Sequence, residues 1–67
     1  MPELNVAPNL ADPDTFYESL IRAHEGLATA QSHAMNAALV LLLANHVGDA
    51  QVLQDALARA RALAEAG

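Results

Sequence analysis

Hydrophobic side chains recur with helical spacing in three segments of the chain, and the middle segment is apolar on every side. Residues 13–26 place their apolar side chains on one arc of a helical wheel and their charged side chains on the opposite arc, and residues 50–65 show the same division. In the middle segment, residues 30–47, the unbroken apolar run at 37–44 covers the whole circumference. Such a helix is typical of a buried position. The pattern predicts an all-α fold of three helices.

Capping residues mark the ends of the predicted helices. Asp12 suits the N-cap of the first helix, and Gly26 suits its end. Thr29 is predicted to cap the second helix, Gly48 to end it in a left-handed conformation, and Asp49 to cap the third. Because the links are short, helices adjacent in sequence should run antiparallel. The predicted architecture is a small three-helix bundle, completed by oligomerisation.

Residues 1–11 lack a helical pattern and are predicted to form an extended N-terminal arm ahead of the three-helix domain at residues 12–67. Pro2 and Pro8 disfavour a helix in the arm. The general behaviour of chain termini favours a frayed arm. In the alternative interpretation, the arm lies along a groove of this or a neighbouring subunit through its apolar residues, Leu4, Val6 and Leu10.

The middle helix presents two apolar faces. The inner face, predicted to form the intramolecular core, consists of Met35, Leu39, Leu42, Leu43 and His46. It is expected to meet apolar residues of the other two helices, Phe16, Leu20, Val52, Leu53 and Leu57. The outer face, predicted to be an interface between molecules, consists of Ala37, Val40, Leu41, Ala44 and Val47. The first and third helices have one apolar stripe each, and both stripes are needed to cover the inner face. The outer face would then be exposed to water, and an exposed apolar patch of this kind usually marks a binding site. Alternatively, these two helices splay and cover both faces.

Composition limits the classes of function and the ways in which so short a chain is stabilised. The 67 residues include no cysteine, so disulfides are excluded, and oligomerisation, a metal or very good packing must reinforce the small core. Three arginines stand against eight acidic residues, a formal net charge of -5, which argues against binding to nucleic acids and anionic membranes. The acidic start and the length of the apolar run predict a cytoplasmic protein without signal peptide or membrane span.

Candidate chemistry is confined to one tyrosine and three histidines. Tyr17 and His24 lie two turns apart on one side of the first helix, which is as compatible with a partly exposed edge of the core as with a polar pair inside an interface. Together with His46 they are the candidates for a ligand contact or a polar core. His46 lies near the end of the middle helix, where an imidazole can bond free carbonyl groups. Metal-binding histidines of one helix usually lie three or four residues apart, and His33 and His46 do not. We therefore predict no metal, no cofactor and no catalytic residue.

Two stretches of the chain resemble a family of short proteobacterial proteins of unknown function. They are NLADPDTFYE at residues 9–18 and LVLLLANHVGD at residues 39–49, and the resemblance covers roughly residues 9–61. Genes of this family tend to lie beside those of flavoprotein hydroxylases of aromatic catabolism, which implies an accessory role. Family members begin their second helix with an acidic Ser-Asp-Glu turn, whereas this chain has Ala-Thr-Ala at residues 28–30. The resemblance implies no catalytic residues.

Three functional hypotheses follow. The leading one is a non-catalytic helical association module, either a homodimer or higher homo-oligomer, or a small accessory subunit of a larger enzyme, which the resemblance implies is flavin-dependent. The second is a small-molecule or metal binder that uses core histidines. The third is a small enzyme, ranked last because the sequence has no cysteine, no Gly-rich phosphate loop and no serine at a distinctive spacing from a histidine.

Overall fold

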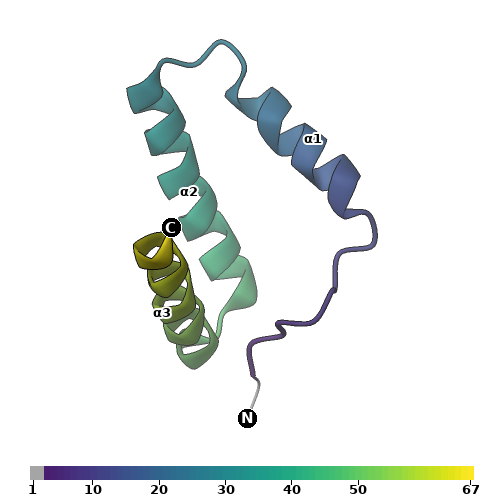
Figure 1. Ribbon diagram of the computed structural model, residues 1–67, viewed down its shortest axis with the longest axis vertical. Coiled ribbons are helices and arrows are strands. Elements are labelled where there is room, and N and C mark those ends of the chain that lie inside the picture. Colours follow the sequence, from purple (N-terminus) through teal and green to yellow (C-terminus); the bar gives the residue numbers. More distant parts are fainter. Residues whose placement is uncertain (1–2) are drawn as a thin grey trace.

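The computed structural model describes residues 3–67 and contains three α-helices joined by short links (Figure 1). Helix α1 spans Pro13–His24, α2 spans Thr29–Val47 and α3 spans Ala50–Ala66. No strand occurs within residues 3–67. The predicted all-α fold of three helices is confirmed, and each helix boundary lies within two residues of its predicted place.

The start of α1 follows the predicted capping pattern, whereas its end comes two residues earlier than predicted. Asp12 Oδ1 accepts a hydrogen bond from the Thr15 backbone N–H at 3.1 Å, and the Thr15 hydroxyl donates to Asp12 Oδ2 at 2.7 Å. Both hydrogen bonds lower the pKa of the Asp12 carboxyl, because they stabilise its charged form. The bond from the Thr15 hydroxyl has the larger effect and the bond from the Thr15 backbone N–H the smaller. The helix ends at His24, two residues before Gly26, which takes a positive φ of 78° in the following turn.

The start of α2 differs from the prediction that Thr29 caps it. Ala28 occupies the N-cap position, and Thr29 is already the first helical residue. The Gln31 side chain supplies the polar contact here, since its Oε1 accepts a hydrogen bond from the Ala28 backbone N–H at 3.0 Å. The glutamine at the third helical position reaches back to the chain before the helix, as in one half of a capping box.

Two residues reverse the chain between α2 and α3, as predicted (Figure 1). Gly48 has a φ of 72°, a left-handed conformation that residues with a Cβ rarely adopt, and its N–H donates to the Ala44 carbonyl at 2.9 Å. Asp49 then caps α3, because its Oδ1 accepts a hydrogen bond from the Val52 N–H at 3.0 Å. Local sequence therefore specifies this turn completely.

The predicted intramolecular core does not form among the described residues, none of which is fully buried. Its half-buried members are Leu20, Met35, Leu39, Val52 and Leu53. Its exposed members are Phe16, Leu42, Leu43, His46 and Leu57. The physical reason is the divergence of α1 from α2 away from their link (Figure 1), and Leu42 and Leu43 in the later turns of α2 stay exposed.

The chain is correspondingly open for its size. Its solvent-accessible surface is 5819 Å², whereas a compact monomer of 7.0 kDa exposes about 4,000 Å². Its radius of gyration is 13.6 Å, against about 11 Å for a compact chain of 67 residues. The chain therefore exposes about 1,800 Å² more surface than a compact monomer of the same mass.

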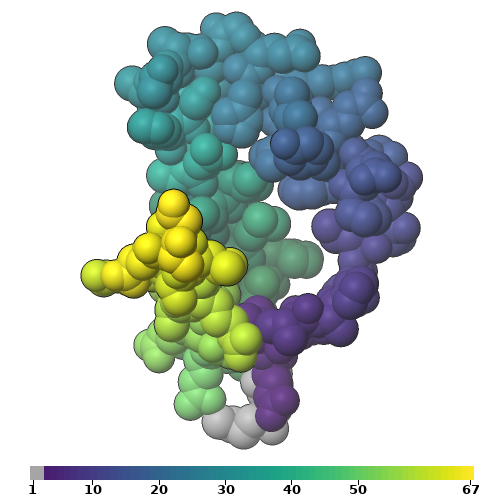
Figure 2. All heavy atoms as spheres, in the orientation of Figure 1, coloured from purple at the N-terminus to yellow at the C-terminus, as the bar shows by residue number. Residues whose placement is uncertain are grey.

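The described part of the N-terminal arm contains no helix, and residues 1 and 2 of the predicted arm lie outside the described residues. Leu4 is half-buried and lines a shallow pocket of about 300 Å³ together with α3 residues that include Val52 and Arg59. In Figure 2 the purple arm lies beside the lower part of α3, which is drawn in yellow-green. Val6 and Leu10 are exposed, so the arm contacts the helices through Leu4 rather than through all three predicted apolar residues.

Candidate association surface

The predicted outer face of α2 is largely exposed. Leu41 is 72% exposed, and Ala37, Val40 and Val47 are exposed as well. Ala44 is the half-buried member of this face. In the single chain, therefore, α1 and α3 do not splay so as to cover both faces of α2.

Exposure extends beyond the outer face to the leucines that we expected in the core. Leu42 is 69% exposed, and Leu43 is exposed too. Together with Val40, Leu41 and Val47 they form what we call the apolar band of α2. Successive residues of a helix point about 100° apart, so the four consecutive residues of the band surround the helix. The all-round apolarity of the sequence was the signal for this surface, although the assignment to two separate faces missed its continuity.

The apolar band lies on a helix without formal charge. Thr29–Val47 contains no Asp, Glu, Lys or Arg, and its polar side chains are neutral amides, hydroxyls and two histidines. Burying a formal charge at an interface is costly unless the charge is paired. A partner can therefore cover α2 without that cost.

A groove between α1 and α2 adjoins the band. It has a volume of about 210 Å³ and is lined by Phe16, Ser19, Leu20, Ala23, Met35 and Leu39. We call it the α1–α2 groove. An opening between α2 on one side and α1 and the arm on the other is visible in the space-filling view (Figure 2). The groove is apolar apart from one serine, so it suits hydrophobic side chains.

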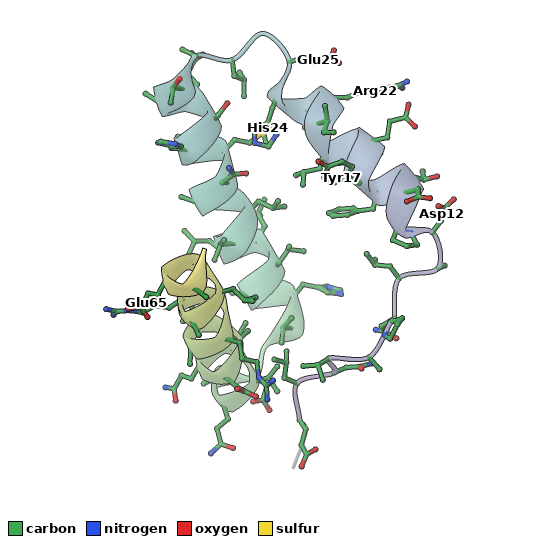
Figure 3. All side chains as sticks on the ribbon, in the orientation of Figure 1. Asp12, Tyr17, Arg22, His24, Glu25 and Glu65 are labelled. Atoms are coloured by element: carbon green, nitrogen blue, oxygen red, sulfur yellow. The ribbon has the colours of Figure 1, made fainter. Side chains whose placement is uncertain are left out.

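His24 links α1 to α2 beside this groove, and its side chain points toward α2 in Figure 3. Its Nδ1 lies 2.8 Å from the Leu20 carbonyl oxygen, and its Nε2 lies 3.1 Å from Asn36 Oδ1. Because a carbonyl only accepts, Nδ1 carries the hydrogen. The contact between Nε2 and Asn36 joins α1 to α2, so the ring ties the two helices together near their link.

Of the two interpretations that the sequence left open for Tyr17 and His24, the polar pair does not form in the single chain, because both ring nitrogens of His24 contact other residues. Tyr17 is exposed. Asn36, the actual partner, was missed by sequence reasoning. Its signal was its position as a polar residue next to the apolar run of the middle helix.

The remaining histidines are dispersed. His33 and His46 are both exposed, and His46 lies in the last turn of α2, as predicted. Within residues 3–67 no three side chains of the His, Cys, Asp or Glu type come together in a way that could hold a metal ion.

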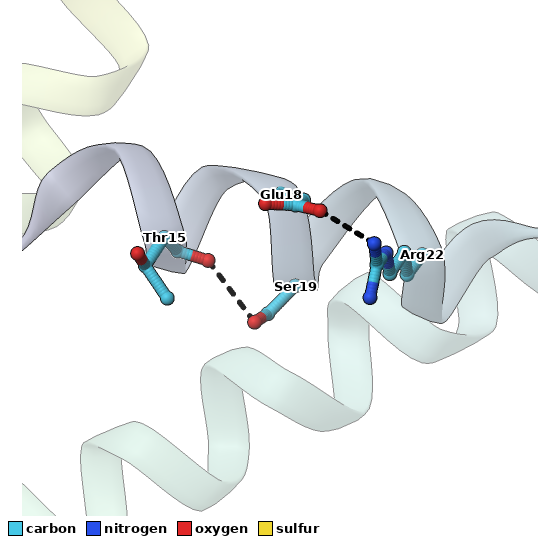
Figure 4. Close-up of polar contacts among 4 residues, drawn as sticks. All are labelled: Thr15, Glu18, Ser19 and Arg22. Atoms are coloured by element: carbon cyan, nitrogen blue, oxygen red, sulfur yellow. Dashed lines mark hydrogen bonds and ion pairs between the residues drawn. The ribbon is translucent and has the colours of Figure 1, made fainter.

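The arginines form ion pairs within their own helices. Arg22 contacts Glu18 at 2.6 Å on α1, next to a hydrogen bond from the Ser19 hydroxyl to the Thr15 carbonyl (Figure 4). The two α3 arginines make similar pairs four residues apart, Arg59 with Asp55 and Arg61 with Glu65. Exposed pairs of this kind contribute little stability. All three arginines thus face local acidic partners.

Comparison with known proteins identifies the family of this chain. Along residues 3–67, no helix has the length and apolarity needed to cross a membrane. No curated protein and no solved structure matches the chain. A family model described as a protein of unknown function, DUF2783, matches residues 4–62, which include α1, α2 and most of α3. The sequence resemblance to a family of unknown function is thereby confirmed. The chain belongs to the DUF2783 family of proteins of unknown function.

Proposed function

We propose that this protein is a non-catalytic helical association module, which uses the apolar band of α2 to bind a second copy of itself or a subunit of a larger enzyme. The observation that carries this proposal is the exposure of four consecutive apolar residues, Val40 to Leu43, on an uncharged helix. Continuous exposed apolar surface of this kind usually marks a binding site on a soluble protein.

The amount of surface left in water supports association. The chain exposes about 1,800 Å² more than a compact monomer of its mass, and a stable interface buries about 800 Å² of each partner. The excess is thus sufficient for a stable interface. Association would also bury apolar side chains, which the single chain does not do fully, since none of residues 3–67 is fully buried.

The polar side chains support a role without catalysis. Asp12 and Asp49 cap helices, His24 joins α1 to α2, and the arginines pair within their helices. These contacts all serve the fold. The sequence resemblance adds a candidate for the larger partner, a flavin-dependent enzyme of aromatic catabolism in the cytoplasm.

The native mass of the protein tests this proposal. We expect the unmodified protein to migrate at twice 7.0 kDa or more, and the Leu41→Glu variant to migrate as a single chain with unchanged helical circular dichroism. Leu63→Glu is the matched control, because Leu63 is 75% exposed but lies on α3. An unmodified protein that migrates at 7.0 kDa, both alone and in cell extract, would contradict the proposal.

A further inference from the structure

We propose that the occupant of the apolar band is a second copy of this chain, and that leucines from α2 of that copy insert into the α1–α2 groove. This inference rests on the proposed function and specifies both its partner and its docking site. The partner helix lies across the mouth of the groove and contacts Phe16 and Leu20 of α1 and Leu39 of α2.

The dimensions of the chain match those of half an intertwined dimer. A compact protein of 134 residues, twice this chain, has a radius of gyration of about 14 Å. One chain already reaches 13.6 Å, so it spans nearly the whole extent that a compact dimer would occupy. The excess surface of two copies, about 3,600 Å², falls in the range of obligate homodimers and above that of most transient contacts.

Charge also favours a second copy over a partner of opposite sign. The chain has a formal net charge of -5, but α2 contributes no Asp, Glu, Lys or Arg. Two copies that meet along α2 therefore keep their carboxylates apart from one another. A surface that binds a basic protein would instead need acidic residues at the apolar band, and α2 has none.

The size of the groove determines what enters it. A volume of about 210 Å³ accommodates leucine side chains, whereas a whole helix, about 10 Å across, does not fit. The exposed Leu41 and Leu42 supply such side chains. Insertion of apolar side chains from one helix between residues of another is the packing mode of helical assemblies.

Two-fold symmetry accounts for the unusual apolarity of α2. In a symmetric dimer each copy makes the same contacts with the other. The α2 helix of one copy then lies against the partner's α2, which forms one wall of the groove, and against the partner's α1, which forms the other wall. It also adjoins its own α1 and α3. A helix with neighbours on all of these sides needs apolar residues around its circumference, whereas α1 and α3 need one stripe each.

Paired substitutions on α1 test the docking site. Phe16 lines the groove and is 46% exposed, while Ile21 is 50% exposed and lies outside it. We expect Phe16→Glu to yield single chains at a concentration where the unmodified protein is dimeric, and Ile21→Glu to remain dimeric. Both variants should retain the helical circular dichroism of the unmodified protein.

Cysteine cross-linking covers the case in which Phe16→Glu fails to fold, since the natural chain has no cysteine. A Phe16→Cys chain is mixed with chains carrying one cysteine at each position from 40 to 43 in turn, and a short bismaleimide is added. We expect at least one mixture to give a covalent dimer, and none with Ile21→Cys in place of Phe16→Cys. A dimer that is insensitive to Phe16→Glu and gives no Phe16→Cys cross-link would overturn the docking site but keep the association module. An unmodified protein that is monomeric alone but bound in extract would overturn the second copy as partner.

Discussion

Truncation of Leu41 to alanine should weaken self-association strongly while leaving the single chain nearly unchanged. Complete burial of a leucine side chain contributes roughly 1.5–3 kcal/mol. Leu41 is 72% exposed in the single chain, so roughly 1–2 kcal/mol of this contribution remains to be gained on association. A two-fold interface contains the residue twice, and the expected loss is therefore about 2–4 kcal/mol per dimer. Since about 1.4 kcal/mol corresponds to a factor of ten, the dissociation constant should rise about 30- to 700-fold.

Sedimentation equilibrium over a concentration series measures this change directly. Leu63→Ala provides the control, because Leu63 is 75% exposed on α3 and the same number of carbon atoms is removed. We expect its dissociation constant to stay within a few-fold of that of the unmodified protein. If Leu41→Ala and Leu63→Ala shift the constant equally, or neither shifts it, the apolar band is not the interface.

Three further predictions concern the fold of the chain. Gly48→Ala should lower the free energy of unfolding by roughly 1–2 kcal/mol in chemical denaturation, because its φ of 72° disfavours a Cβ, whereas Gly67→Ala should be nearly neutral. The capping bonds lower the pKa of Asp12 in the folded state, so its stabilisation is present above the ordinary pKa of the unfolded carboxyl and is lost as pH falls through the folded pKa. Helicity should therefore decrease on acidification below about pH 4, and Asp12→Asn, which caps without titrating, should lack this part of the decrease. Asn36→Ala removes the partner of His24 and should lower the free energy of unfolding by about 0.5–1.5 kcal/mol; an unchanged denaturation midpoint would show that this hydrogen bond does not hold α1 to α2.

Local signals in the sequence were sufficient to predict the secondary structure. Asp12 and Asp49 cap helices where their positions before apolar segments indicated, and Gly48 adopts the left-handed conformation that ends α2. These interactions span four residues or fewer along the chain, so they depend little on tertiary structure. The Thr29 cap was wrong because the helix begins one residue earlier, with Ala28 at the N-cap, and the polar side chain that bonds the chain there is that of Gln31.

Tertiary contacts were predicted less well, because a helical wheel gives direction but not distance. The wheel grouped Leu39 with Leu42 as core residues, but Leu39 is half-buried and Leu42 is exposed, because a wheel does not show that α1 diverges from α2 away from their link. The same limitation hid the contact between His24 and Asn36, which depends on how the link positions two helices. The outer face is exposed except at Ala44, but Leu42, Leu43 and His46 of the inner face are exposed as well, so counting apolar stripes did not distinguish the two faces.

The absence of a fully buried side chain among residues 3–67 has a consequence for how this protein behaves in the cell. If association supplies the missing burial, the paired chains are more stable than the single chain, and the melting temperature rises with protein concentration by mass action. While the concentration of newly made chains is below the dissociation constant, most chains are unpaired, and their leucines are accessible to chaperones and proteases. Degradation would remove such unpaired chains preferentially, so the steady-state amount of protein would follow the supply of its partner.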